Sequence, residues 1–194
     1  MGKRVYILVA EGFECVETLS PIDVLHRAGV EVVRVAVGGS LVVRSSHDLM
    51  SLECDVLIEE CDFEDGAALI LPGGNPGYIN LRNSDVVLRV VRDYYDGGRL
   101  VAAICGAPTV LAAAGVARGC RVTCHASVVA EMRDYNLVDS KVVEDGNLII
   151  AAGAGISIDF ALAIANRLVD SETMLRVQQG IDRKSTRLNS SHSN

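Results

Sequence analysis

The residue best suited to chemistry in this sequence is a cysteine between an apolar run and a predicted helix. Cys105 follows the run Leu100–Ile104, and the two residues after it, Gly106 and Ala107, are small. A strand that turns into a helix this abruptly forces its corner residue into a strained backbone conformation, as in a nucleophile elbow. The corner lies at the carboxyl edge of a parallel sheet, where α/β folds bind their ligands. We therefore predict that Cys105 is the nucleophile of an active site.

The helix predicted directly after Cys105 should favour the ionised form of the thiol. Unpaired N–H groups and the positive end of the helix dipole stabilise a thiolate and lower the pKa of a cysteine. A cysteine can also serve as a small core hydrophobe. We prefer that interpretation for Cys15, Cys54, Cys61 and Cys120.

A glycine-rich loop after another apolar strand could bind an anion. The segment Leu71-Pro72-Gly73-Gly74-Asn75 closes the strand, and its glycines let the backbone approach a ligand closely. The N–H groups of Gly73 and Gly74 could form an oxyanion hole in a site that processes an acyl group or an aldehyde. The alternative is a plain tight turn. The cysteine corner one strand–helix unit later favours the anion-binding interpretation of the loop.

Two further side chains could act with Cys105. Glu17 lies three residues after Glu14, on a helix predicted to reach the same edge of the sheet, so its carboxyl could face the cysteine. Beside a thiolate this carboxyl would stay protonated, because two adjacent anions repel, and it could then donate a hydrogen bond to sulfur. His125 follows a short predicted strand. A lone histidine is more often structural, and a general acid or base role requires the fold to bring it near Cys105.

Apolar runs and helical patterns alternate along the chain, which predicts a mostly parallel sheet with helices on both faces. The predicted strands are 4–10, 30–37, 67–71, 100–104 and 147–151, with shorter strands at 42–43, 56–58 and 121–124. The predicted helices are 16–28, 85–95, 107–114, 158–169 and 173–179. Ser20-Pro21 predicts a kink or a restart in the first helix. We assign residues 1–181 to one domain and interpret the Ser/Asn-rich residues 182–194 as a disordered or artefactual tail.

Composition narrows the class of protein. The chain has 194 residues, 49% of them hydrophobic, and a formal net charge of −7, which argues against disorder and against sequence-specific nucleic-acid binding. No export signal or membrane span is predicted, so we expect a cytoplasmic protein whose six cysteines are reduced. Cys120, Cys124 and His125 hint at a metal site, but neighbours on a strand point to opposite faces, and we predict no metal.

Several stretches together resemble the ThiJ/PfpI superfamily, most closely its DJ-1 branch, which includes the parkinsonism-associated protein deglycase. The resemblance covers the chain from about Lys3 to about Gly180. The matching stretches are Glu14-Cys15-Val16-Glu17-Thr18, Leu71-Pro72-Gly73-Gly74-Asn75, Ala102-Ala103-Ile104-Cys105-Gly106-Ala107-Pro108-Thr109 and Asp159-Phe160-Ala161-Leu162-Ala163-Ile164.

The resemblance implies a flavodoxin-like three-layer sandwich and a homodimer. It makes Cys105 the oxidisable nucleophile, Glu17 its protonated partner and His125 an accessory histidine. Gly74 and Gly106 become backbone donors. Asn75 and Ala154 are candidates for lining the site.

Three positions depart from the family pattern. Gly106 stands where the protease-type branch has His, which argues against a Cys-His peptidase. His47 replaces a frequent Arg at a dimer contact, and Ala154 replaces a frequent Pro.

The sequence supports three functional hypotheses. The first is a glyoxalase or deglycase without metal or organic cofactor, in which Cys105 attacks a methylglyoxal-type dicarbonyl or an early glycation adduct to form a hemithioacetal. The second is a redox-sensing chaperone or oxidative-stress protein whose Cys105 is oxidised to the sulfinate. The third is a non-catalytic scaffold that retains only the fold.

Overall fold

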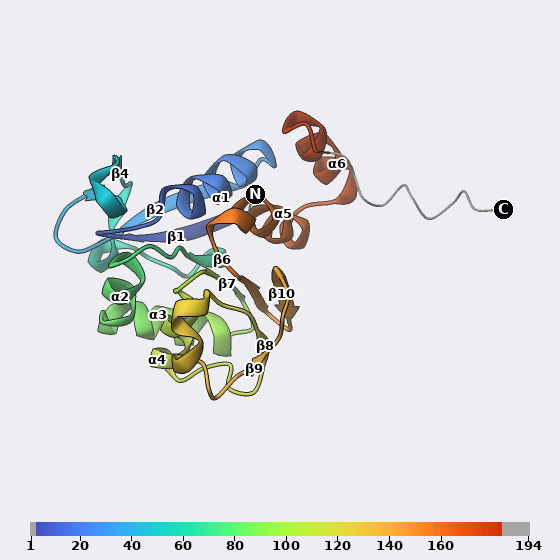
Figure 1. Ribbon diagram of the computed structural model, residues 1–194. Helices are drawn as coiled ribbons and strands as arrows, with labels where there is room; N and C mark the ends of the chain where they lie inside the picture. Colours follow the sequence, from blue (N-terminus) through green and yellow to red (C-terminus); the bar gives the residue numbers. More distant parts are fainter. Residues whose placement is uncertain (1–2, 184–194) are drawn as a thin grey trace.

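A seven-stranded sheet forms the centre of the computed structural model, which describes residues 3–183 (Figure 1). All neighbouring strands run parallel except the pair at one edge, where β10 is antiparallel to β11. The strands, in spatial order, are β10 (Val142–Asp145), β11 (Leu148–Ala151), β7 (Leu100–Ile104), β6 (Gly66–Leu71), β1 (Arg4–Ala10), β2 (Glu31–Val37) and β5 (Val56–Leu57).

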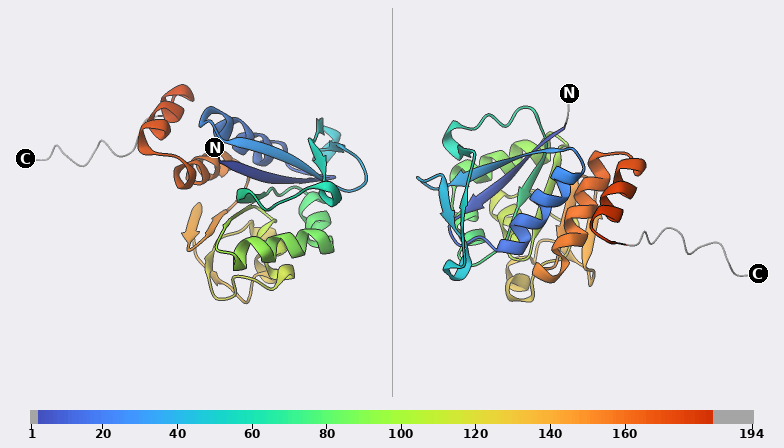
Figure 2. Two further views of the ribbon diagram at one scale, coloured as in Figure 1. Left: turned by 180° about the vertical axis from the view of Figure 1, so that it is seen from behind. Right: turned by 90° about the horizontal axis from the view of Figure 1, so that it is seen from above.

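Helices cover both faces of this sheet and complete three layers (Figures 1 and 2). One face carries α1 (Cys15–Arg27), α5 (Ser157–Leu168) and α6 (Ser171–Gly180). The other carries α2 (Gly77–Arg82), α3 (Asp85–Asp96) and α4 (Pro108–Ala114). The predicted α/β sandwich is therefore confirmed.

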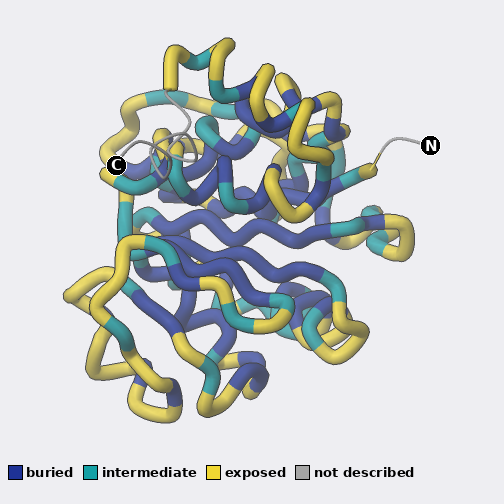
Figure 3. Tube along the Cα trace, turned by 90° about the vertical axis from the view of Figure 1, so that its right-hand side faces the viewer, coloured by how far each residue is buried: buried dark blue, intermediate teal, exposed yellow. Residues whose placement is uncertain are grey.

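The apolar runs of the sequence are continuous because the central strands are buried on both faces. Along β1, Val5 and Ile7 pack into one core cluster, while Tyr6 and Leu8 pack into the other. Figure 3 shows this band of buried strands between more exposed helices and loops. Aliphatic side chains make up most of both clusters, as expected for a chain without tryptophan, and Phe13, Phe160 and Tyr94 are the largest side chains buried among them.

The smaller elements differ from the sequence expectation in extent. The predicted strand at 121–124 is only β8 (Arg121–Val122), which pairs with β9 (Asn136–Leu137). A hairpin of β3 (Val42–Arg44) and β4 (Ser51–Glu53) encloses the 3-10 turn η1 (Ser46–Asp48). Three further 3-10 segments are η2 (Ile58–Glu60), η3 (Ala126–Glu131) and η4 (Ala154–Ile156).

Two expectations about helix ends and interiors are corrected. The first helix does not restart at Pro21, which lies buried inside the continuous α1 and leaves the Glu17 carbonyl without its usual N–H partner. At the other end of the chain, Asp182 and Arg183 belong to the structured region, because the Arg183 N–H donates to the Gln178 carbonyl and its guanidinium pairs with Asp159. The rest of the predicted tail, 184–194, lies outside the described residues.

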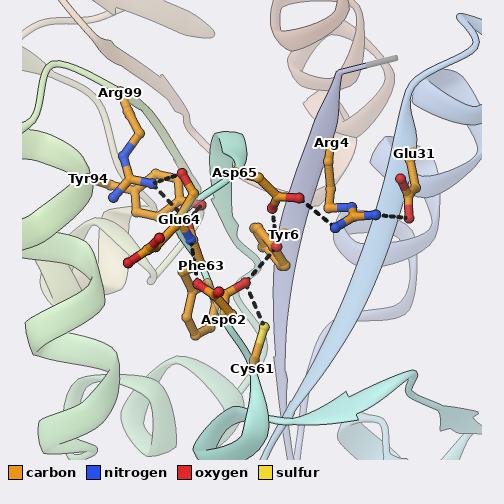
Figure 4. A network of polar contacts seen from close by, with 10 residues as sticks. All are labelled: Arg4, Tyr6, Glu31, Cys61, Asp62, Phe63, Glu64, Asp65, Tyr94 and Arg99. Carbon is orange, nitrogen blue, oxygen red and sulfur yellow. Dashed lines mark hydrogen bonds and ion pairs between the residues drawn. The ribbon is translucent and has the colours of Figure 1, made fainter. Parts of the chain in front are cut away.

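A polar network holds the amino edge of the sheet around the loop 61–65 (Figure 4). The Tyr6 hydroxyl oxygen lies 2.7 Å from the Asp62 carbonyl oxygen and 2.6 Å from the Asp65 carboxylate, and its single proton is shared between these two acceptors. Arg99 donates to the Phe63 carbonyl at 2.8 Å. A cavity of about 440 Å³ opens between this loop and α3. Its walls mix apolar, acidic and arginine side chains, and no predicted site residue lines it.

No helix within residues 3–183 is long and apolar enough to cross a membrane.

Candidate active site at the carboxyl edge of the sheet

Cys105 occupies the sharp corner between β7 and α4. Its φ of 65° lies in the left-handed region, which is strained for a residue with a side chain. Two backbone hydrogen bonds hold the corner: the Cys105 N–H donates to the Ala151 carbonyl at 3.0 Å, and its own carbonyl accepts from the His125 N–H at 2.9 Å. The thiol is half-buried. This geometry confirms the predicted elbow.

Glu17 is the buried acid of this site. It is fully buried on α1, and its Oε2 accepts the Gly73 N–H at 2.9 Å. Within residues 3–183, Oε1 has no hydrogen-bond partner at standard distance, although the carboxyl is near enough to the Cys105 thiol for that thiol to lower its pKa. A lone buried acceptor is costly, whereas a protonated oxygen there could donate to sulfur. The structure thus brings Glu17 and Cys105 together, as the sequence predicts.

Burial dominates the ionisation of this pair. It raises the pKa of Glu17 from 4.5 to about 7, against the opposing effects of the Cys105 thiol and the Gly73 N–H. It also raises the pKa of Cys105 to about 12, with a further rise from the Glu17 charge, while the Gly106 and Gly74 N–H groups lower it. Two groups this close titrate as a unit, so the pair loses its first proton near pH 7.

The expected lowering of the thiol pKa by a helix end is therefore wrong. The helix that follows Cys105 has only seven residues, Pro108–Ala114, and its dipole does not offset the loss of solvent around the sulfur. The group available to take the thiol proton is the neighbouring carboxylate.

The glycines of the site are required by close contacts. A Cβ on Gly73 would lie 2.5 Å from Glu17 Oε2, and one on Gly74, whose φ is 96°, would lie 2.3 Å from the Glu14 nitrogen. A Cβ on Gly106 would lie 2.6 Å from Cδ1 of Tyr78. Because the Gly73 N–H is bonded to Glu17, it is not free to bind a substrate oxygen. Of the three predicted backbone donors, Gly74 and Gly106 remain, and both N–H groups lower the pKa of the Cys105 thiol.

The other predicted residues lie at the rim. His125 is exposed, is joined to Cys105 through its main chain, and caps η3 with its ring. Asn75 is exposed in the loop between β6 and α2, and Ala154 is exposed at the start of η4. His47, the departure at the expected dimer contact, has a φ of 61° in the hairpin turn.

Two residues near the site were not predicted from the sequence. The Tyr78 ring packs against Gly106, and its own N–H donates to the Gly74 carbonyl at 2.9 Å. Ser127 contacts the His125 ring, with its hydroxyl oxygen 2.8 Å from Nδ1. Tyr78 lies four residues after Gly74, which is the spacing of one helical turn. This spacing could have indicated from the sequence that the Tyr78 side chain returns to the glycine loop.

The fold and the site define a class of protein: a flavodoxin-like α/β sandwich with an elbow cysteine paired to a buried glutamate. Comparison with known proteins agrees. The model of the DJ-1/PfpI family matches residues 3–167. The chain belongs to the DJ-1/PfpI family.

Three relatives show how close the similarity is. Protein dj-1beta of Drosophila melanogaster is 37% identical over 93% of this chain and 97% of its own length. Its crystal structure superimposes with a TM-score of 0.91, covering 95% of this chain and 100% of that one. Protein/nucleic acid deglycase 2 of Escherichia coli is 30% identical over 78% of this chain and 89% of its length. An oxidized Toxoplasma gondii DJ-1 structure, 27% identical, has a TM-score of 0.87, covering 95% of this chain and 100% of that one.

Proposed function

We propose that this protein is a cysteine-dependent glyoxalase or deglycase that acts on methylglyoxal-type dicarbonyls or their early adducts with amines. The observation that supports this most directly is the Glu17–Cys105 pair, whose carboxyl pKa of about 7 suits proton transfer at neutral pH. The Gly74 and Gly106 N–H groups beside the sulfur suit an oxyanion. The Escherichia coli relative is named as a deglycase, which supports the same reaction class.

The reaction needs no external oxidant. Glu17 accepts the thiol proton as the Cys105 sulfur bonds to the aldehyde carbon, and the resulting alkoxide takes up a proton to give a hemithioacetal. The hydrogen on that carbon then moves as a proton to the adjacent carbonyl carbon through an enediol, so that one carbon is oxidised and its neighbour is reduced. This leaves a thioester on Cys105. Water cleaves the thioester, releases a 2-hydroxy acid and restores the thiol.

The test is lactate formation from methylglyoxal by the purified protein. We expect Cys105→Ser to abolish turnover, because the serine hydroxyl is a far weaker nucleophile than the thiol. Cys61→Ser is the matched control, since Cys61 is a half-buried thiol at the opposite edge of the sheet. Undiminished turnover by Cys105→Ser would refute the assignment, and so would equal losses in both variants.

A second candidate function is redox sensing at the same sulfur. The two backbone N–H groups and a protonated Glu17 could bind the oxygens of a sulfinate, and the Toxoplasma gondii relative was solved in an oxidized form. Each equivalent of peroxide would add one oxygen to the sulfur and leave as water. Mass spectrometry after mild peroxide treatment should locate two added oxygens on Cys105. Oxidation confined to the other thiols would rule this function out.

We also propose that the protein is a cytoplasmic homodimer. Val16 at the start of α1 and Val42 and Leu49 of the β3–β4 hairpin are large apolar side chains left 47%, 53% and 76% exposed. The hairpin lies beside the loop that leads into α1, because Phe13 pairs with Ser45. Six free thiols suit a reducing compartment. Sedimentation of the wild type and of Val42→Asp should give a dimer and a monomer respectively.

A further inference from the structure

The ring of His125 is held in place by the residue two positions after it. His125 stands at the N-cap of η3, where the Ser127 N–H donates to its Nδ1 at 3.2 Å. The Ser127 hydroxyl oxygen lies 2.8 Å from the same nitrogen. One edge of the imidazole is therefore fully engaged by Ser127.

These contacts determine which ring nitrogen carries the proton. A backbone N–H can only donate, so the Ser127 N–H favours an unprotonated Nδ1, to which the nearer hydroxyl then also donates. A neutral imidazole has one protonated nitrogen, and in His125 this must be Nε2. The imidazolium, with a donor at both nitrogens, could not accept the Ser127 N–H at all.

The ring carbon next to Nε2 lies beside the loop that follows β11. Cδ2, the carbon bonded to Nε2, lies 3.6 Å from where a Cβ on Gly153 would be. Gly153 follows β11, whose last residue Ala151 accepts the Cys105 N–H at 3.0 Å. The main chains of His125 and Cys105 are joined by a further bond of 2.9 Å. The Cδ2–Nε2 edge of the ring therefore lies next to the loop after β11, a strand that is itself hydrogen-bonded to the elbow.

We propose that Ser127 is a positioning residue that fixes His125 as the Nε2–H tautomer, so that this histidine donates a hydrogen bond to a substrate oxygen instead of removing a proton. The part of this proposal that makes a substrate oxygen the acceptor rests on the proposed function. The tautomer itself rests only on the contacts between Ser127 and His125. In the reaction above, His125 would donate to the carbonyl oxygen next to the carbon attacked by Cys105. Proton transfer at carbon is then left to Glu17.

The tautomer can be measured without any substrate. Long-range proton–nitrogen NMR spectra of the ¹⁵N-labelled protein at pH 8 should show an unprotonated Nδ1 and a protonated Nε2 for His125, with His125→Gln identifying its signals. Ser127→Ala removes the nearer partner of Nδ1, the hydroxyl at 2.8 Å, and leaves only the N–H at 3.2 Å, so a detectable fraction of the Nδ1–H form should appear, while Ser127→Thr should restore the wild-type spectrum. A protonated Nδ1 in the wild type would overturn the proposal, as would a Ser127→Ala spectrum identical to it.

Turnover of methylglyoxal tests the role of the histidine as donor. His125→Gln keeps an N–H donor close to the position of Nε2 and should retain activity within about 10-fold, whereas His125→Ala should lose about 100-fold, as for other lost oxyanion donors. Ser127→Ala should lower kcat, with rescue by Ser127→Thr and no effect of Ser140→Ala, a matched loop serine. Equal losses in His125→Gln and His125→Ala would refute the donor role. An inactive wild type with the expected NMR tautomer would refute the enzyme assignment and leave the Ser127–His125 contact intact.

Discussion

Replacing the buried carboxyl by an amide should change how the stability of the protein depends on pH. Glu17 has a folded-state pKa of about 7 against 4.5 for the free side chain, chiefly because it is buried. A raised pKa means that the folded state binds the proton more tightly than the unfolded chain does. The group therefore contributes its full stability below about pH 4.5, and this contribution is lost as pH rises through about 7. The difference between the two pKa values corresponds to about 3 kcal/mol.

Glu17→Gln has the same shape as the protonated acid, and its amide oxygen can still accept the Gly73 N–H. We expect its free energy of unfolding to match that of the wild type at pH 4.5 and to exceed it by up to about 3 kcal/mol at pH 8. Urea unfolding of both proteins between pH 4.5 and 8.5 measures this gap, and Glu53→Gln, an exposed carboxyl on β4, is the control. A constant gap between the wild type and Glu17→Gln across this range would refute the reasoning.

Three other outcomes follow from the same contacts. Alkylation of Cys105 by iodoacetamide should accelerate through about pH 7, because Glu17 ionises there and its carboxylate can take the thiol proton as sulfur attacks, and a midpoint at an ordinary thiol value would contradict the pairing. Gly73→Ala should destabilise the protein by about 1–3 kcal/mol in urea, because its Cβ would clash with the buried acid, whereas Gly155→Ala, with open space around it, should have little effect. Gly106→Ala should also destabilise, and adding Tyr78→Ala should recover part of that loss; strict additivity would show that the ring is not the obstacle.

The features that the sequence predicts well are those with a local cause. Cys105 was recognised because small residues surround an abrupt change from strand to helix, and the central strands were recognised as unbroken apolar runs. The first helix does not restart at Pro21, and the strand expected at 121–124 extends only over Arg121–Val122, since tertiary packing overrides local preference in α1 and around β8. The edge strand β10, antiparallel to β11, was not predicted from the sequence, because its segment Val142–Asp145 is short and half of it is acidic.

The ionisation of the site could not be predicted, because it depends on contacts between distant segments. Glu17 meets Gly73 across 56 residues of sequence, and that contact determines both which glycine is free to bind substrate and how deeply the acid is buried. The sequence indicated a helix end beside Cys105 but gave no measure of solvent around the sulfur. Desolvation, the larger effect, reversed the expected direction of the thiol pKa.

Three features of the site, each unfavourable to folding, occur within contact distance of one another. Cys105 has a φ of 65°, Glu17 is a fully buried carboxyl with one oxygen that finds no partner among residues 3–183, and Gly73 leaves no space for a side chain between them. Strained or poorly solvated groups persist only where the surrounding structure holds them, and they concentrate at functional sites. If the protein had to keep only its fold, a substitution such as Glu17→Gln would remove the free-energy cost of the buried carboxyl without any loss of function. The presence of all three at one corner of the sheet therefore favours chemistry at Cys105 over the non-catalytic scaffold.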